Sequence, residues 1–161
     1  MLFVRNAVQE DLPHILDAYA FARQFMARNG NPTQWGDTHP PKELLEVDIS
    51  RQQLYVVCDG EDICGVFAFI PGKDPTYGYI EGSWHHSDPY GTIHRIAGNG
   101  KKKGVFQVAV SFAKGKTGHI RIDTHKNNTI MQHVLQKNGF SYCGIIYLEN
   151  GDPRLAYDWH I

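Results

Sequence analysis

The stretch HRIAGNGKKKGVFQVAVSFAK, residues 94 to 114, passes from a strand-like apolar segment through glycines and three lysines into a helical pattern. A helix N-terminus offers backbone N–H groups without intrahelical partners and the positive end of the helix dipole. Glycines in front of it let the backbone approach phosphate oxygens, and lysines add positive charge. The stretch therefore predicts a phosphate-binding loop before a helix over 104–114, with an exposed turn that binds nothing as the alternative.

Two widespread phosphate-binding motifs do not fit this loop. The Gly-x4-Gly-Lys-Ser/Thr pattern of P-loop enzymes is absent from the chain. Gly98, Gly100 and Gly104 are wrongly spaced for the dinucleotide-binding fingerprint, and no early βαβ unit carries them. The anion is therefore expected to be bound in another fold.

Length and composition predict one globular domain over residues 1–161. Hydrophobic residues make up 42% of the chain and charged residues 20%, as in ordinary soluble proteins. A formal net charge of -1 argues against a general nucleic-acid binder, because such proteins are usually basic. No apolar run approaches the roughly 20 residues of a membrane-spanning helix, and no signal peptide is evident. Three cysteines are too few for a disulfide framework. We therefore expect a cytoplasmic protein without nucleic-acid or membrane partners.

Hydrophobic periodicity predicts the element order β-α-α-β-β-β-α-β-α-β-β. The predicted strands cover 2–8, 53–59, 63–70, 91–97, 119–125, 142–148 and 152–161, with an edge piece at 77–84; the predicted helices lie between about 9 and 28 and at 42–50, 104–114 and 127–140. The unit at 92–124 needs a crossover, so strands 92–97 and 119–124 should be parallel neighbours. The fold class is therefore α/β of the α+β kind, with a central mixed, mostly antiparallel sheet flanked by helices.

This element order, with a basic glycine loop between the fourth strand and the third helix, resembles the GNAT superfamily of acetyl-CoA-dependent N-acyltransferases. The resemblance covers essentially the whole chain. The family signature Gln/Arg-x-x-Gly-x-Gly/Ala is matched by residues 101–106, and its downstream Asn-x-x-Ala…Gly-Phe pattern by Asn128, Met131, Gly139 and Phe140. The resemblance implies a GNAT-like fold, an acyltransferase activity and acetyl-CoA as co-substrate.

The resemblance also implies which residues contact the co-substrate. In the family, loop amides hold the CoA pyrophosphate, and the fourth strand lies along the pantetheine and the acetyl carbonyl. Asn128 is expected to cap the fourth helix and to reach the co-substrate or substrate. Carried over to this chain, the cofactor-binding residues are Ile96, Ala97, Gly98, Lys101, Lys102, Lys103, Gly104, Val105, Phe106 and Asn128.

The chain departs from the family pattern at several positions, and two of these, Phe106 and Leu135, keep an alternative open. Lys101 replaces the usual Arg or Gln, and Phe106 stands where Gly or Ala lets the backbone approach phosphates. Leu135 stands where many members have a tyrosine that protonates the leaving thiolate. The alternative is a noncatalytic CoA-binding or interaction protein on the same fold.

The family reaction is the attack of a primary amine on the acetyl thioester, and the amine must lose a proton to a base. His94 lies on the fourth strand, and an imidazole, with an ordinary pKa of ~6.5, suits this task; Glu81 and water are the alternatives. Tyr142 is the expected general acid, with Tyr147 and His125 as alternatives.

The acceptor, a small-molecule or protein amine, is expected to bind to aromatic and polar loop residues, or these aromatics only pack the loops. The expected substrate-binding residues are Trp35, Glu81, Trp84 and Tyr90. The nine histidines show no compact ligand spacing and no metal motif, so no metal is expected. Dimers through the final strands are common in the family, so a homodimer stays open.

Overall fold

The computed structural model describes all 161 residues and contains one mixed sheet between helices. Its strands are β1 (Leu2–Asn6), β2 (Leu54–Asp59), β3 (Asp62–Pro71), β4 (Glu81–Gly82), β5 (Gly91–Gly98), β6 (His119–Thr124), β7 (Ser141–Tyr147) and β8 (Pro153–His160). Its helices are α1 (Leu12–Arg28), α2 (Lys42–Ser50), α3 (Val105–Lys114) and α4 (Thr129–Lys137), with 3-10 turns η1 (Gln9–Asp11) and η2 (Pro75–Tyr77). The predicted order of elements is confirmed, and the edge piece at 77–84 contains only the short β4.

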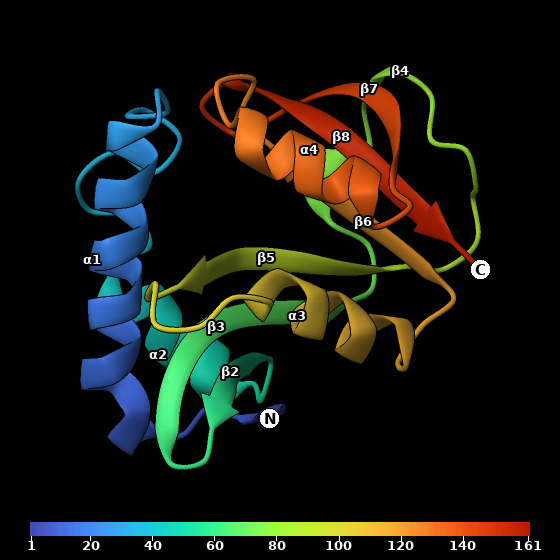
Figure 1. Cartoon of the computed structure of the whole chain (residues 1–161). Helices are drawn as coiled ribbons and strands as arrows, with labels where there is room; N and C mark the ends of the chain where they lie inside the picture. Colours follow the sequence, from blue (N-terminus) through green and yellow to red (C-terminus); the bar gives the residue numbers. More distant parts are fainter.

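The sheet has eight strands in the order β1-β2-β3-β5-β6-β8-β7-β4 (Figure 1). β5 and β6 are parallel neighbours, as the crossover predicts, and the other six pairs are antiparallel. The prediction of a mixed, mostly antiparallel sheet flanked by helices is therefore confirmed. No helix has the length and apolar character needed to cross a membrane.

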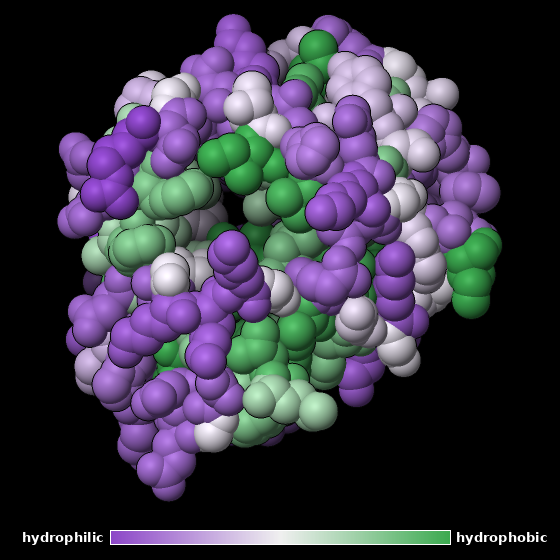
Figure 2. Space-filling model, viewed as in Figure 1, coloured by the Kyte–Doolittle hydropathy of each residue, from purple (hydrophilic) through white to green (hydrophobic).

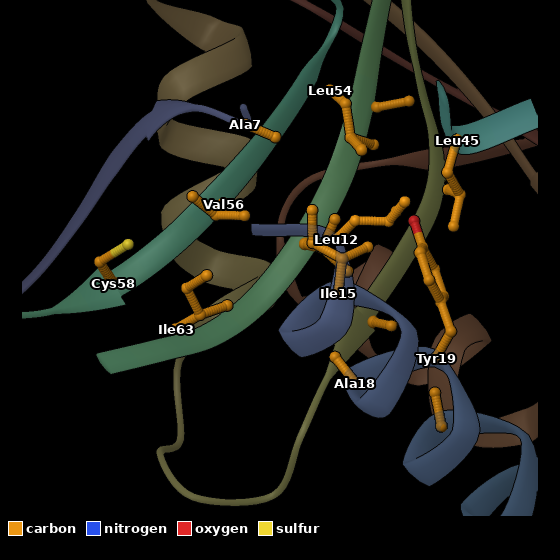
Figure 3. Close-up of a cluster of buried hydrophobic side chains, with 14 residues drawn as sticks. Ala7, Leu12, Ile15, Ala18, Tyr19, Leu45, Leu54, Val56, Cys58 and Ile63 are labelled. Atoms are coloured by element: carbon orange, nitrogen blue, oxygen red, sulfur yellow. The ribbon is translucent and has the colours of Figure 1, made fainter. Parts of the chain in front are cut away.

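Helices cover both faces of the sheet because the strand residues alternate between two cores. Val56 packs with α1 and α2 in one cluster, whereas its neighbour Val57 packs with α3 and α4 in the other. Figure 3 shows the first cluster, in which Ile15 and Tyr19 of α1 face the strands that carry Leu54 and Val56. This alternation determines which face each site residue occupies.

Over the second half of the sheet, one face is covered by the segment between β3 and β5 and not by an α-helix. Tyr77 and Tyr90 from this segment are buried against Ile146 of β7 and Ala156 of β8. This third cluster lies on the face that α1 and α2 cover in the first half. The segment 72–90 is therefore part of the wall beside β5 and β6.

β5 and β6 separate soon after they pair. Their register includes only Gly91 with Ile120 and Thr92 with Arg121, although both strands continue further. Figure 1 shows the two strands diverging, and Figure 2 shows a deep hollow, rimmed by apolar side chains, in the same part of the molecule. We call this region the β5–β6 opening.

A bulge in β5 accompanies this divergence. The pairing of β3 with β5 shifts between Val66 and Ala68, and Arg95 on the opposite strand has a φ of 53°, in the left-handed region. The Arg95 guanidinium lies 2.8 Å from the buried Asp48 carboxylate of α2. The backbone carbonyl of Arg95 accepts a 2.6 Å hydrogen bond from the Tyr19 hydroxyl of α1. The two helices therefore hold the bulge that bends β5.

Candidate active site

The lysine loop leads into an uncapped helix N-terminus. α3 follows Gly104, whose φ is 91°, and no side chain caps its first turn. Lys101 and Lys103 are exposed and form no ion pair, whereas Lys102 lies 3.1 Å from the Asp59 carboxylate. The structure therefore leaves first-turn amides and two free ammonium groups at one place, which is the arrangement that binds an anion.

Side-chain contacts hold this loop close to the sheet. The Asn99 amide donates to the Ile63 carbonyl at 2.8 Å, and its oxygen accepts from the Lys101 N–H at 3.0 Å. Gly65 of β3 has no Cβ, and an added Cβ would lie 2.4 Å from a methyl group of Val105. Gly65 therefore lets the first turn of α3 approach the sheet beside the β5–β6 opening.

Phe106 is half-buried against the α3–α4 core. Its ring is therefore packed on the protein while its backbone N–H remains in the first turn of α3. Ile96 and Ala97 of β5 pack into opposite cores, and Gly98 ends the strand next to the lysine loop. The predicted cofactor-binding residues 96–106 therefore form one continuous path from the β5 bulge to α3.

His94 of β5 forms a pair with an acid that the sequence did not single out. Its Nε2 lies 2.8 Å from an oxygen of Asp74, in the loop after β3. The other Asp74 oxygen accepts from the backbone and hydroxyl of Thr76 at 2.8 Å and 2.7 Å. The Asp74 N–H donates to the Tyr90 hydroxyl at 2.8 Å. Both oxygens and the backbone of Asp74 are therefore fixed.

These contacts decide the ionisation of Asp74 and the hydrogen position on His94. Burial opposes the charge on Asp74, but the hydrogen bonds from His94 and Thr76 outweigh it and lower the pKa of this carboxyl to about 2. An ionised carboxylate only accepts hydrogen bonds, so His94 Nε2 carries the hydrogen. The other ring nitrogen, Nδ1, has no hydrogen-bond partner in the protein and is the atom available to take a proton.

A small cavity lies against this pair. Its volume is about 170 Å³, and Ile70, Lys73, Asp74, Thr92 and His94 are among its lining residues. The Thr92 hydroxyl is buried and has no hydrogen-bond partner in the protein. The cavity therefore offers a carboxylate and an imidazole to a small polar molecule.

A second acid stands on β6, across the β5–β6 opening from His94. The Tyr77 hydroxyl donates to an oxygen of Asp123 at 2.6 Å, and the Tyr77 ring lies 6.3 Å from the His94 ring. Burial raises the pKa of Asp123, although positive charge from His94 and the Tyr77 hydrogen bond oppose this shift. Asp123 and Tyr77 therefore extend the polar cluster from β5 to β6.

The α1–α2 loop crosses from α1 to α4. The Gln34 side-chain oxygen accepts from Asn31 at 2.8 Å and from Asn128 at 3.1 Å, and the Gln34 carbonyl accepts from Arg154 of β8 at 3.3 Å. The expected cap is confirmed, because the Asn128 oxygen accepts from the Met131 N–H at 3.0 Å. The side chain of Asn128 therefore already serves the cap and the loop.

Trp35 lies in the same loop, where its ring meets Tyr19 edge-on at 5.6 Å. Trp84 and Tyr90 are placed differently, because both rings lie 4.2 Å from the Arg121 guanidinium and enclose it between them. These two aromatics therefore support the wall of the site, and only Trp35 lies in the loop that crosses from α1 to α4.

The structure does not bring Tyr142 to His94. Tyr142 packs on Tyr157, a member of the α3–α4 core, whereas His94 faces the other side of the sheet. Three strand steps separate β5 from β7, each roughly 4.8 Å. Tyr142 therefore lies three strands away from His94 and on the other face of the sheet, so the two residues do not belong to one cluster.

The alternative acid and base residues are also displaced from His94. Glu81 is exposed on the edge strand β4, and its hydrogen bond is the main cause that raises the pKa of Tyr147. His125 follows β6 and lies 3.4 Å from the Thr33 hydroxyl of the α1–α2 loop. Leu135 is completely buried in the core. Of the sequence-derived candidates, His94 is the only acid–base group that lines the cavity.

The chain was compared with known proteins. No protein-family model and no curated protein matches it significantly. Among solved structures, a GNAT-family acetyltransferase from Streptococcus agalactiae is 32% identical, with a TM-score of 0.90 over 99% of this chain and 95% of that one. GNAT-family acetyltransferases from Listeria monocytogenes (19% identity, TM-score 0.73, 99% and 95% covered) and Bacillus cereus (20%, 0.62, 99% and 97%) share the fold. At this identity and coverage, the chain belongs to the GNAT family of acetyltransferases.

Proposed function

We propose that the chain transfers the acetyl group of acetyl-CoA to a primary amine of a small molecule or protein. The observation that carries this proposal is the His94–Asp74 pair, which lines a cavity beside the β5–β6 opening and leaves one ring nitrogen of His94 without a hydrogen-bond partner in the protein. Acetyl transfer to an amine needs a proton acceptor at such a place. Family membership supports acetyl transfer in general, and the residues of this site support the amine acceptor.

The features expected of a CoA site lie along one path. The uncapped start of α3, with Lys101 and Lys103, suits a pyrophosphate. The divergence of β5 from β6 leaves the edge of β5 unpaired beyond Thr92, and an extended chain such as pantetheine fits beside an unpaired strand edge. We infer that residues 96–98 and 101–106 contact acetyl-CoA.

The reaction follows from these positions. The amine nitrogen forms a bond to the acetyl carbon while the carbon–sulfur bond breaks, and the thiolate leaves. His94 Nδ1 takes the proton that the amine loses, and the thiolate takes up a proton from solvent. Asp74 keeps the hydrogen on Nε2 and stabilises the imidazolium that forms.

The acceptor is best described as a small amine that enters in its ammonium form and loses one proton to water before it attacks. A cavity of about 170 Å³ fits a short side chain better than a bulky ring system. Asp74 is ionised at neutral pH and attracts a cation.

A noncatalytic CoA-binding protein is the second candidate. The buried Leu135 favours it, because α4 then supplies no tyrosine to protonate the thiolate. The two functions differ in turnover: a binder holds CoA but releases no thiol when an amine is added.

The experiment supplies acetyl-CoA and a panel of amines, measures thiol release, and confirms acetylation of the acceptor by mass. The proposal expects release that depends on the amine and falls in His94→Gln. CoA binding without amine-dependent release across the panel would establish the binding function instead.

A further inference from the structure

Three side chains of metal-ligand type meet behind the loop between β4 and β5. His85 comes from this loop, Cys143 from β7 and Asp158 from β8. His85 Nδ1 lies 2.8 Å from an Asp158 oxygen and 3.5 Å from Cys143 Sγ. All three donor atoms lie within 4.8 Å of one another. They converge from positions far apart in the chain.

One of these separations already suits a tetrahedral zinc ion. Zinc–sulfur bonds of about 2.3 Å and zinc–nitrogen bonds of about 2.0–2.1 Å, at the tetrahedral angle, place the two ligand atoms about 3.5 Å apart. The sulfur–nitrogen distance already has this value. The His85–Asp158 contact would open by about 0.5 Å to become the nitrogen–oxygen edge of the same tetrahedron. A thiolate, an imidazole and a carboxylate together favour zinc over magnesium or calcium.

The surroundings hold the ligands in place. The second Asp158 oxygen accepts the His85 backbone N–H at 2.9 Å, so the carboxylate is oriented independently of the ring. Cys143 lies at a bulge in β7, and its carbonyl accepts from the Ser83 N–H at 3.1 Å. Cys143 and Asp158 are buried, whereas the His85 side chain is 44% exposed. Solvent therefore reaches the site from the His85 side, where a fourth ligand would enter.

A neighbouring group of potential ligands has a different character. His86, Asp88 and His160 also lie close together, but none of them is buried and none offers sulfur. The His86 and His160 rings stack at 3.9 Å, and Asp88 already accepts from His160 at 3.0 Å. This group is best explained by its own stacking and ion pairing, and it serves as an internal comparison.

We propose that His85 Nδ1, Cys143 Sγ and one oxygen of Asp158 bind a zinc ion, with water as the fourth ligand. On binding, the thiol proton leaves to solvent and the imidazole hydrogen moves to the exposed Nε2. The ion joins the 83–90 loop to β7 and β8. Because Tyr90 in this loop contacts Asp74, the metal would stabilise the wall of the candidate active site.

The test uses the whole chain and two probe ions. Cobalt(II) bound through a thiolate gives sulfur-to-metal absorption in the near ultraviolet and tetrahedral bands in the visible. The wild-type protein is expected to show both, to bind one ion per chain and to lose the signal when zinc is added. Zinc should also raise the melting temperature, because it binds the folded state.

Variants locate the site. His85→Gln, Cys143→Ser and Asp158→Asn should each weaken binding by more than about 100-fold, above the loss typical of an outer-shell change. Cys58→Ser, which removes another buried cysteine, and His86→Gln, in the neighbouring group, should keep wild-type binding. His85→Gln is decisive if the buried variants fail to fold, because its side chain is largely exposed.

Two results would overturn the proposal. The first is no thiolate-to-cobalt absorption in folded wild-type protein, which would leave His85 and Asp158 as a hydrogen-bonded clamp. The second is wild-type binding in His85→Gln together with loss in His86→Gln, which would move the site to the neighbouring group.

Discussion

His94 Nε2 lies 2.8 Å from an Asp74 oxygen, and these residues are 20 positions apart in the chain. The contact joins β5 to the loop that follows β3. It fixes the hydrogen on one ring nitrogen and leaves the other without a hydrogen-bond partner in the protein. The chemistry proposed for the site depends on this relationship.

Asp74→Asn should lower kcat by about 10²-fold, the low end for the loss of acid–base function. The amide cannot hold the Nε2 hydrogen as the carboxylate does, so the proton acceptor is no longer fixed at Nδ1. The KM for acetyl-CoA should hold, because Asp74 lies on the acceptor side. Steady-state kinetics measures kcat and the KM of each substrate. A raised KM for the amine with an unchanged kcat would mean that Asp74 binds the acceptor and does not take part in proton transfer.

Asp74 should also make the folding stability depend on pH in the acid range. Its pKa is lowered to about 2 in the folded chain, so the unfolded chain takes up the proton first as the pH falls. Its contribution, about 2 kcal/mol from the pKa shift, is present above about pH 4 and is lost as the pH falls to about 2. Denaturant unfolding at several pH values measures this loss. Between pH 4 and 2, the free energy of unfolding should change less steeply with pH in Asp74→Asn than in the wild type. An equal slope in both proteins would show that other carboxyl groups cause the pH dependence.

The lysines before α3 should differ in their effect on CoA. Lys101→Glu and Lys103→Glu should each weaken CoA binding about 10-fold, the loss of roughly one charge-assisted contact. Lys102→Glu changes the charge equally but starts from a lysine already paired with Asp59, so its effect should be smaller. Calorimetry with CoA and with pantetheine, which lacks the phosphates, separates the contributions. Equal weakening of both ligands would show that the lysines do not face the phosphates.

Tyr142→Phe should leave kcat within about threefold of wild type, because a general acid must lie within hydrogen-bond reach of its target. The ring contact with Tyr157 is kept in this variant. A loss of about 10² in kcat would mean that Tyr142 reaches the thiolate after all.

The sequence predicted the framework of the site well. The element order, the parallel pair and the position of His94 on the fourth strand follow from periodicity and the crossover rule. The glycines and lysines before α3 also indicated the uncapped helix start. These features are local, so a single stretch of chain carries their signal.

The partners of His94 carried no such signal. Asp74 lies in a loop whose path depends on Tyr90 and Thr76, and Asp123 meets Tyr77 only through the folded sheet. The left-handed backbone at Arg95 cannot be predicted from the sequence, because the residue there is not a glycine. Contacts with Asp48 and Tyr19, from two different helices, hold this conformation instead. Contacts of this kind depend on packing between distant segments.

Two further features depended on the sheet as a whole. Tyr142 begins the strand that follows α4 in the sequence, but the strand order puts β8 and β6 between this strand and β5. His85, Cys143 and Asp158 meet only because a loop, β7 and β8 come together, and their spacing in the sequence matches no metal motif.

The central claim is that His94 takes the proton from the amine, and the pH dependence of kcat/KM in wild type and His94→Gln tests it most directly. With one amine acceptor, the pH profile of wild-type kcat/KM should contain an acid limb that depends on His94. His94→Gln should lower kcat/KM by about 10²-fold and remove this limb, while the affinity for CoA stays the same. A variant with the wild-type pH profile and rate would contradict the account.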